Sequence, residues 1–453
     1  AAHKVSIVSA HGQSGARLGC AVKRKPDSWS WRDGGNGMAV STSATNEPAQ
    51  RKKVAPEIVI VAACMISMLT FGPRAASGNF QLPIMSANGW GSDTFSFALA
   101  MQNLLWGIGQ PFAGALADRF GTMRILCGGA VLYATGLVLM SVSSSPATFT
   151  FSAGLLIGFG LSGCSMSLVV GALAKLVPDH KRAMAFGLVT AAGSFGQFLF
   201  SPLSGAMIQS LGWQMTTVLF GVLMLCILPL SLAVASAPMK AAVAGAPKQQ
   251  TTREALSEAF AHRSYVLVVL GFFTCGFQLA FITVHFQKYV VEAGLSPQVG
   301  YWAFALVGLF NIVGSLSSGY LSNRMPRRWI LSFIYISRAI ATAIFISLPP
   351  TAITAYLFGA VSGLLWLSTV PPTSAIIGQM FGTRYFAMLY GFAFFSHQVG
   401  GFLGVLLGGV LREATGSYNI VWWLSIALGI ASALINLPIV EKPVVRKDSA
   451  VTA

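Results

Sequence analysis

The sequence predicts an all-α membrane protein with twelve transmembrane helices, arranged as two pseudo-symmetric six-helix bundles. Three observations predict this fold class: the composition, the spacing of the apolar runs and a long internal repeat. Hydrophobic residues make up 54% of the 453 residues and charged residues only 9%, with a mean hydropathy of +0.68. A soluble globular domain carries roughly 25% charged residues, so this composition excludes one.

Apolar runs recur from Pro56 onward. Each is near the ~20 residues that a helix needs to cross ~30 Å of hydrocarbon. The first six predicted spans cover residues 56–78, 94–117, 124–144, 149–174, 183–208 and 215–236. The second six cover residues 265–288, 300–322, 329–348, 352–374, 386–411 and 418–438. The tenth span contains the pair Pro371-Pro372, which we expect to break or bend its helix.

An internal repeat relates the two sets of spans. The charged, glycine-rich stretch from Gly114 to Leu126 returns about 205 residues later, between Gly319 and Leu331. In this second copy Asn323 stands where the first copy has Asp118. Identical residues in span 5 and just after it also recur 204 residues on, in span 11 and just after it. A repeat this long indicates that one half of the protein was built twice.

The chain divides into five predicted parts: residues 1–54 as a disordered cytoplasmic tail, 55–237 as the N-terminal bundle, 238–263 as a cytoplasmic linker, 264–438 as the C-terminal bundle and 439–453 as a cytoplasmic tail. In the linker, Thr251 and Glu254 have the spacing of a capping box, which predicts a short amphipathic helix. Met38 opens a stretch typical of a bacterial N-terminus. This suggests the hypothesis that residues 1–37 do not belong to the native protein.

The basic residues give the predicted orientation. Lys and Arg gather in alternate loops and in both tails, and the opposite loops hold only Lys288 and Arg412. Because cytoplasmic loops of membrane proteins carry the excess of Lys and Arg, we expect both termini in the cytoplasm. The same distribution accounts for the net charge of +16 without a nucleic-acid partner. We expect a multi-pass protein of the bacterial inner (plasma) membrane.

The stretch Gly114-x-Leu-Ala-Asp-Arg-x-Gly-x-x-Arg124, between spans 2 and 3 of two repeated sixes, resembles the loop motif of the major facilitator superfamily. The entry to span 5, Lys181–Gly187, and the sparse acids resemble its oxalate/formate antiporter and monocarboxylate porter branch. The cation of that branch in span 8 is missing, because Asn311 and Ser315 stand in its region. The resemblance implies the major facilitator fold and a secondary transporter that works by alternating access.

The loop motif also implies a gate. We expect Asp118 to accept hydrogen bonds from the amides that begin span 11 near Phe386, because the start of a helix favours an anion. The contact would hold the cytoplasmic side shut. A plain solvated turn is the alternative. The other gating residues implied by the motif and its repeat are Gly114, Arg119, Gly121, Arg124, Asn323 and Arg324.

Ionisable residues inside the spans carry the functional argument. No Asp or Glu lies in the middle of a predicted span, whereas Arg74, Arg338, His285 and His397 lie in or near membrane depth. A cation there costs at least ~2.5–3.5 kcal/mol unless it faces a cavity or a partner. Since the sequence offers no acidic partner, an anionic substrate is the natural counter-ion.

Each candidate substrate-binding residue has its own alternative role. His397 is expected near the midplane of span 11, and its alternative is a buried histidine bonded to a neighbouring helix. Arg74 either binds substrate or reaches to the outer interface. Arg338, in a peripheral span, is expected to pair with backbone carbonyls or a polar neighbour rather than substrate. The full set of substrate-binding candidates is His397, Gln398, Gln278, His285, Arg74, Asn311 and Trp366.

We therefore expect a secondary active transporter, antiporter or symporter, for a small monocarboxylate or dicarboxylate, acting as a monomer. No nucleophile–base pairing, metal-ligand cluster or phosphate loop is visible, so we expect no enzymatic activity, metal or cofactor. The six cysteines have no paired spacing. One alternative is an exporter of drugs or hydrophobic metabolites, and a second is a membrane sensor that does not transport. The sequence leaves substrate, direction and coupling open.

Overall fold

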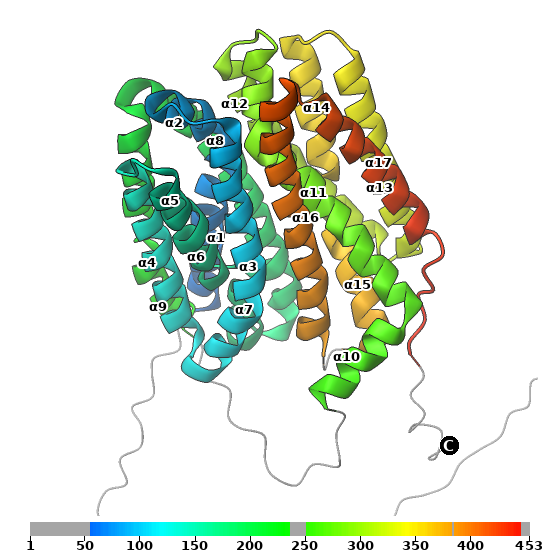
Figure 1. Ribbon diagram of the computed structural model, residues 1–453. Coiled ribbons are helices and arrows are strands. Elements are labelled where there is room, and N and C mark those ends of the chain that lie inside the picture. The colour runs from blue at the N-terminus through cyan, green and yellow to red at the C-terminus, as the bar shows by residue number, and fades with distance from the viewer. Residues whose placement is uncertain (1–54, 236–250, 383–384, 445–453) are drawn as a thin grey trace, which may run out of the picture. The chain divides into compact units, whose positions relative to one another are not determined.

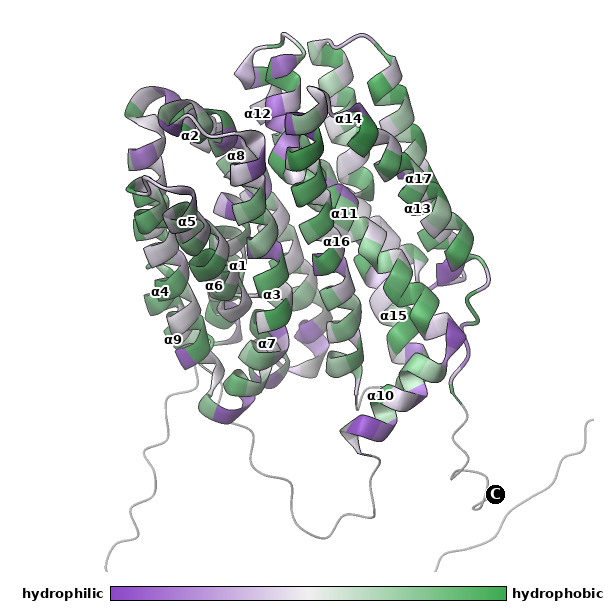
Figure 2. Ribbon diagram, viewed as in Figure 1, coloured by the Kyte–Doolittle hydropathy of each residue, from purple (hydrophilic) through white to green (hydrophobic). Residues whose placement is uncertain are grey.

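The computed structural model describes residues 55–235, 251–382 and 385–444. The predicted tails, 1–54 and most of 439–453, and the first part of the predicted linker lie outside the described residues. Within those ranges the chain is helical and contains no strand. The helices run side by side, with polar residues concentrated near their ends (Figures 1 and 2).

The N-terminal half contains the helices α1 (Pro56–Ala75), η1 (Ala76–Phe80), α2 (Gln81–Asn88), α3 (Ser92–Phe120), α4 (Thr122–Ser141), α5 (Pro146–Phe149), η2 (Thr150–Leu156), α6 (Ile157–Gly163), α7 (Met166–Leu176), α8 (Asp179–Met224) and α9 (Ile227–Ala233). The 46 residues of α8 do not form one straight rod, because Gly212 has φ 81°. The rings of Phe200 and Phe220 lie 5.4 Å apart, whereas 20 residues of straight helix would separate them by about 30 Å. The chain therefore reverses at Gly212, and α8 crosses the bundle twice.

The C-terminal half contains α11 (Arg263–Glu292), α12 (Pro297–Leu321), α13 (Arg327–Ser347), α14 (Ala352–Leu365), α15 (Val370–Phe381), α16 (Phe386–Thr415) and α17 (Asn419–Asn436). The tenth predicted span is broken between α14 and α15, just before Pro371 and Pro372. This confirms the predicted break, because a proline removes a helical N–H and restricts the residue before it.

Among the residues that the structure describes, ten helical segments are long and apolar enough to cross a membrane, and one of them, 54 residues long, contains the reversal at Gly212. The ten do not include the 29-residue α3, which carries Gln102, Asn103 and Gln110 as well as charged residues near its ends. Counting α3 and the two passes of α8 gives twelve passes, as the sequence predicts.

The two halves meet where α3 packs against α16, α8 against α12, and η1 and α2 against α11. Within each half, α1 packs on α8 and α11 packs on α16. These two pairs follow the repeat. A methyl group on Gly196 would meet the carbonyl oxygen of Met68, and one on Gly400, 204 residues later, would meet that of Phe273. Glycine permits this close backbone approach in both halves.

The linker helix α10 (Thr252–Ala261) begins with the predicted capping box. The Thr251 N–H donates to Glu254 Oε2 at 2.8 Å, and the Glu254 N–H donates to Thr251 Oγ1 at 3.3 Å. The ring of Phe260 lies 5.6 Å from that of Phe392 on α16. We call the end of the bundle that carries α10 the α10 end, and the opposite end the far end (Figure 1).

Candidate functional site

Arg338, on α13, hydrogen-bonds to backbone carbonyls at the break in the tenth span. Its guanidinium donates from Nε to the Leu365 carbonyl at 3.1 Å, and from Nη2 to the carbonyls of Leu365 and Trp366. These are the carbonyls that end α14, where a helix leaves acceptors unsatisfied and its dipole favours a cation. Arg338 therefore neutralises a helix end inside the bundle.

Side chains of α12 form hydrogen bonds with other backbone groups at the break. Asn311 accepts from the Leu367 N–H at 3.0 Å and donates to Ser194 Oγ of the N-terminal half at 2.9 Å. Ser318 donates to the Ser368 carbonyl at 2.5 Å. Trp366 is buried, with its ring edge-on to Phe304. Asn311 and Trp366 thus hold the break and the α8–α12 contact together, although the sequence singled them out as substrate-binding candidates.

His285 and Gln278 lie within the C-terminal half. The Nδ1 of His285 is 3.3 Å from the Tyr418 hydroxyl and its Nε2 is 2.9 Å from the Val405 carbonyl, so both ring nitrogens have partners. Gln278 donates to the Ser425 carbonyl at 3.0 Å, and its Oε1 lies 3.5 Å from Arg338 Nη1. Neither side chain offers a free polar atom to a substrate in this conformation.

Arg74 is held very differently. It is 8% exposed, and its Nη1 donates to Ser77 Oγ at 3.1 Å while its Nη2 donates to Asn103 Oδ1 at 2.9 Å. Both acceptors are neutral, and the buried Nε has no partner. No ion pair among the described residues includes Arg74. Arg74 is therefore a buried cation whose Nε–H is available to an acceptor.

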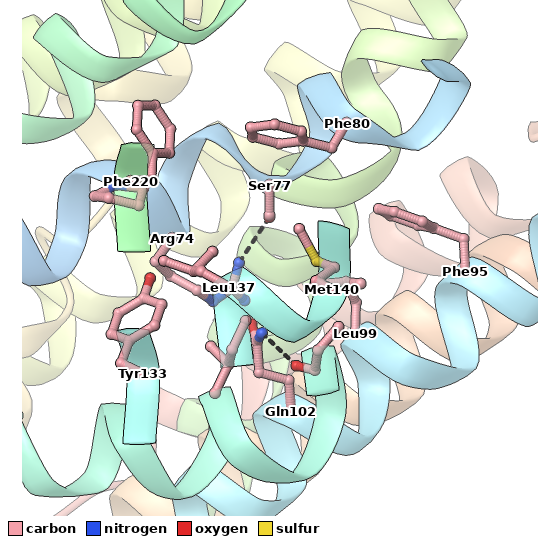
Figure 3. Close-up of a pocket in the computed structure, with 13 residues that line it drawn as sticks. Arg74, Ser77, Phe80, Phe95, Leu99, Gln102, Tyr133, Leu137, Met140 and Phe220 are labelled. Atoms are coloured by element: carbon pink, nitrogen blue, oxygen red, sulfur yellow. Dashed lines mark hydrogen bonds between the residues drawn. The ribbon is translucent and has the colours of Figure 1, made fainter. Parts of the chain in front are cut away.

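A cavity of about 30 Å³ adjoins Arg74 inside the N-terminal half. Figure 3 shows it bordered by Gln102 and Tyr133, with aromatic and aliphatic side chains on its other sides. Gln102 donates to the Ala153 carbonyl at 2.7 Å, and its buried Oε1 has no partner. Since a water needs roughly 10–15 Å³ of such space, the cavity has room for a water or two and for no larger molecule.

Asn103 lies between Arg74 and the boundary of the two halves. A methyl group on Gly401 of α16 would lie 3.6 Å from Asn103 Oδ1. One turn along α3, a methyl group on Gly107 would lie 2.7 Å from Cβ of Gln398. Gln398 is 1% exposed, and its buried Nε2 has no partner. Its Oε1 lies 3.2 Å from Nδ1 of His397, which is half-buried.

We call the residues Arg74, Asn103, Gln398 and His397 the polar seam. The seam takes two members from each half, and two of its members each keep a buried N–H without an acceptor. Leaving such a group unpaired costs about 1–3 kcal/mol, and more where it is charged. The seam is therefore suited to a ligand that supplies acceptor oxygens.

An aromatic layer lies beside the seam, toward the α10 end. It consists of Phe71, Trp106 and Phe394, which each precede or follow a seam residue by about one helical turn. The Trp106 ring lies 6.2 Å from that of Phe71 and 5.5 Å from that of Phe394, both edge-on. Trp106 also donates to Gln110 at 3.2 Å. The layer therefore bridges the two halves, as the seam does.

The predicted gating residues of the N-terminal half lie at the end of α3, at Gly121 and at the start of α4. Asp118 accepts from Lys175 Nζ at 3.0 Å, within its own half. No hydrogen bond joins it to α16 in the part of the chain that the structure describes, so the predicted contact with α16 stays a prediction for another conformation. Gly121 has φ 90°, a backbone angle that favours glycine, and so fixes the turn into α4.

The remaining gating candidates lie at the surface of the α10 end. Arg124 is exposed, and Arg119 stacks 5.2 Å from the Phe120 ring centre. In the repeated loop, Asn323 is 3.4 Å from the Gly319 carbonyl and Arg324 lies 4.2 Å over the Tyr320 ring. A methyl group on Gly114 would meet no atom within 4 Å, so this glycine borders open space.

At the far end the halves are tied by an ionic cluster that sequence reasoning missed. Lys288 lies buried in α11, not in a loop as the sequence analysis placed it. It donates to Ser92 Oγ of the N-terminal half and lies 3.6 Å from Glu292. The Ser92 N–H donates to Glu413 at 3.1 Å, and Arg412 pairs with Glu292 at 2.9 Å. The far end is therefore closed in this structure.

No group of three or more His, Cys, Asp or Glu side chains able to hold a metal ion occurs among the residues that the structure describes. Sequence reasoning also missed Asn103. Its signal was present, because α3 carries Gln102, Asn103 and Gln110 within an otherwise apolar span, and polar residues inside a span usually face the bundle interior.

A sequence model of the Major Facilitator Superfamily matches residues 59–404 and 294–452. The chain is 28% identical over 370 residues to "Uncharacterized MFS-type transporter YcxA" of Bacillus subtilis (strain 168), covering 80% of this chain and 90% of that protein. It is 24% identical over 395 residues to "Monocarboxylate transporter 13" of Bos taurus, covering 84% and 89%. Its fold is similar to the crystal structure of a D-xylose-proton symporter, with a TM-score of 0.68, 15% identity, and coverage of 86% and 100%.

Proposed function

Because the chain belongs to the Major Facilitator Superfamily, we propose that it is a secondary active transporter for a small organic anion, a monocarboxylate or dicarboxylate, bound at the polar seam. One observation carries the proposal: Arg74 is a buried cation whose partners are two neutral oxygens and whose Nε lacks an acceptor. A carboxylate would complete this hydrogen bonding and neutralise the charge. The similarity to proteins named monocarboxylate transporters supports the same substrate class.

The seam suits alternating access because it is built from both halves. Arg74 and Asn103 belong to the N-terminal half, and Gln398 and His397 to the C-terminal half. Rocking of the halves about this line would expose the anion first at one end and then at the other. The closed far end agrees with a conformation open toward the α10 end.

The α10 end faces the cytoplasm in this proposal, since its loops carry most of the Lys and Arg. We place the protein in a bacterial inner membrane, acting as a monomer. The structure leaves no membrane-embedded carboxylate to relay protons: the described Asp and Glu residues lie at or near helix ends. Anion exchange is one mode of coupling. Symport of a proton carried by His397 or by the substrate is the other.

Counterflow in proteoliposomes tests the substrate class. Labelled carboxylates, from acetate and lactate to oxalate, are exchanged against unlabelled pools, with neutral compounds of similar size as the second arm. We expect exchange of at least one carboxylate and of none of the neutral compounds. We also expect weaker exchange in His397→Ala, because the imidazole holds the Oε1 of Gln398.

The aromatic layer favours one alternative, an exporter of hydrophobic compounds, because Phe71, Trp106 and Phe394 offer an apolar surface next to the seam. Exchange of neutral aromatic compounds without any carboxylate exchange would establish that alternative and overturn the anion proposal. Saturable binding with no counterflow at all would instead indicate a sensor.

A further inference from the structure

A pocket of about 460 Å³ opens at the α10 end of the C-terminal half. It lies between the loop that joins α12 to α13, the end of α15 and the segment after α17. Four cations line it: Arg324, Arg327, Arg328 and Lys442. None of them belongs to the polar seam, so the pocket is separate from the proposed transport site.

The one carboxylate in the pocket, Glu441, is already used. Its Oε1 accepts from the Arg328 N–H at 2.8 Å, and its Oε2 lies 3.3 Å from Arg327 Nη1. Gln379 donates to the Glu441 carbonyl at 2.8 Å, which fixes the segment after α17 against α15. The lining residues therefore carry three positive charges more than negative ones, four cations against one carboxylate.

Two features show that cations of the pocket keep N–H groups without acceptors, which an anion could supply. The buried Nε of Arg327 has no hydrogen-bond partner. Arg324 and Lys442 are exposed, and no described carboxylate forms an ion pair with either. The guanidinium of Arg324 rests only on the face of Tyr320, at 4.2 Å. Several N–H groups on two chain segments are therefore free to bind phosphate oxygens.

Aromatic residues place the pocket at the membrane surface. Tyr320 and Trp329 are 56% and 52% exposed, and they lie beside Arg324 and Arg328 respectively. Tyr and Trp concentrate at the level of lipid headgroups. Basic pockets between transmembrane helices at that level bind anionic headgroups.

We propose that this pocket binds the phosphate headgroup of an anionic phospholipid from the leaflet that meets the α10 end. The phosphate contacts Arg324 and Lys442 and accepts from Arg327 Nε, so the lipid ties the loop before α13 to the segment after α17. Binding at this pocket does not depend on the transported substrate.

Native mass spectrometry of the delipidated protein, titrated with phosphatidylglycerol or phosphatidylcholine, tests the proposal. We expect one phosphatidylglycerol to bind much more tightly than phosphatidylcholine. Removing one charge near the membrane surface weakens binding about five-fold, so the double variant Arg324→Gln/Lys442→Gln should bind about thirty-fold more weakly. Both side chains are exposed, so the variant is expected to fold.

The repeat supplies the matched control. The double variant Arg119→Gln/Arg124→Gln removes two exposed charges from the equivalent loop of the N-terminal half and should bind phosphatidylglycerol like the wild type. An equal loss in both double variants, or no loss in either, would overturn the proposal. Competition by inorganic phosphate at concentrations similar to those of the lipid would also overturn it, because the site would then select a soluble anion.

Discussion

Among the described residues, each half of this protein buries one arginine, at positions that the repeat does not relate, and the two are held in different ways. Gln278 follows Arg74 by 204 residues, and Arg338 follows Tyr133 by 205. In the N-terminal half the arginine stands on α1 and borders a cavity with Tyr133. In the C-terminal half the arginine stands on α13 and reaches Gln278 on α11 at 3.5 Å.

The difference lies in the acceptors. Arg338 meets the carbonyls that α14 leaves free at its break, whereas Arg74 meets one hydroxyl and one amide oxygen and keeps a free N–H. A buried cation satisfied by helix-end carbonyls stabilises the fold. One without such acceptors is available to a ligand. The comparison therefore indicates a structural role for Arg338 and supports the proposal that Arg74 binds the substrate.

The largest expected effect on stability is that of Arg338→Gln. It removes charge-assisted hydrogen bonds from the carbonyls of Leu365 and Trp366 inside the bundle. Hydrogen bonds to charged groups contribute about 1.5–3 kcal/mol each, so we expect a loss of about 3 kcal/mol or more. Thermal unfolding in detergent measures it. Arg124→Gln, at an exposed site, is the control and should stay within about 0.5 kcal/mol.

Lys288→Met extends the comparison to a third buried cation. The substitution breaks the contacts of Lys288 with Ser92 and Glu292 that help to close the far end. We expect opening at that end to become about 1–2 kcal/mol easier. The readout is labelling of Ser96→Cys by an impermeant thiol reagent in a cysteine-free background, since Ser96 is buried against Gly409. Labelling as slow as with Lys288 intact would contradict the role of Lys288 in closing the far end.

Gln398→Met tests whether the unpaired Nε2 of Gln398 donates a hydrogen bond to the substrate. The change keeps the shape of the side chain and removes the free N–H. We expect the apparent KM for the carboxylate to rise about five-fold, which corresponds to ~1 kcal/mol for one hydrogen bond. The matched control is Gln278→Met, whose amide is already bonded to Ser425. It should lower stability and leave KM unchanged, and the reverse pattern would contradict the comparison.

Asp118→Asn has the smallest expected effect on stability. Its pair with Lys175 is half exposed and contributes less than about 1 kcal/mol. We nevertheless expect slower counterflow, because the predicted contact of Asp118 with the start of α16 forms in the opposite conformation. Lys175→Gln breaks the same pair without touching that contact. Equal slowing in both variants would show that only the pair with Lys175 matters.

Much of the fold follows from local patterns. The sequence displays directly the spacings that predict the twelve passes and the repeat. The capping box at Thr251 and the break before Pro371 depend on a few neighbouring residues each. The two passes of α8 were also predicted, as spans 183–208 and 215–236, and the backbone angle of Gly212 marks the reversal between them.

The candidate site was less predictable. The sequence argument counted acidic partners for the buried cations and found none, but it had no means of counting backbone carbonyls. The carbonyls of Leu365 and Trp366 become acceptors only when α13 packs beside the break. Asn103 was missed because its importance comes from lying between Arg74 and Gly401, on three different helices.

Counterflow of a labelled carboxylate by Arg74→Gln, set beside the thermal stability of the same preparation, tests the central claim most directly. Removing a buried charge that pairs with a ligand costs about 2–5 kcal/mol in binding. We therefore expect exchange at least about thirty-fold slower at subsaturating substrate, with stability within about 1 kcal/mol of the wild type. Wild-type exchange in a stable Arg74→Gln protein would contradict the claim that this arginine is the counter-charge of the substrate.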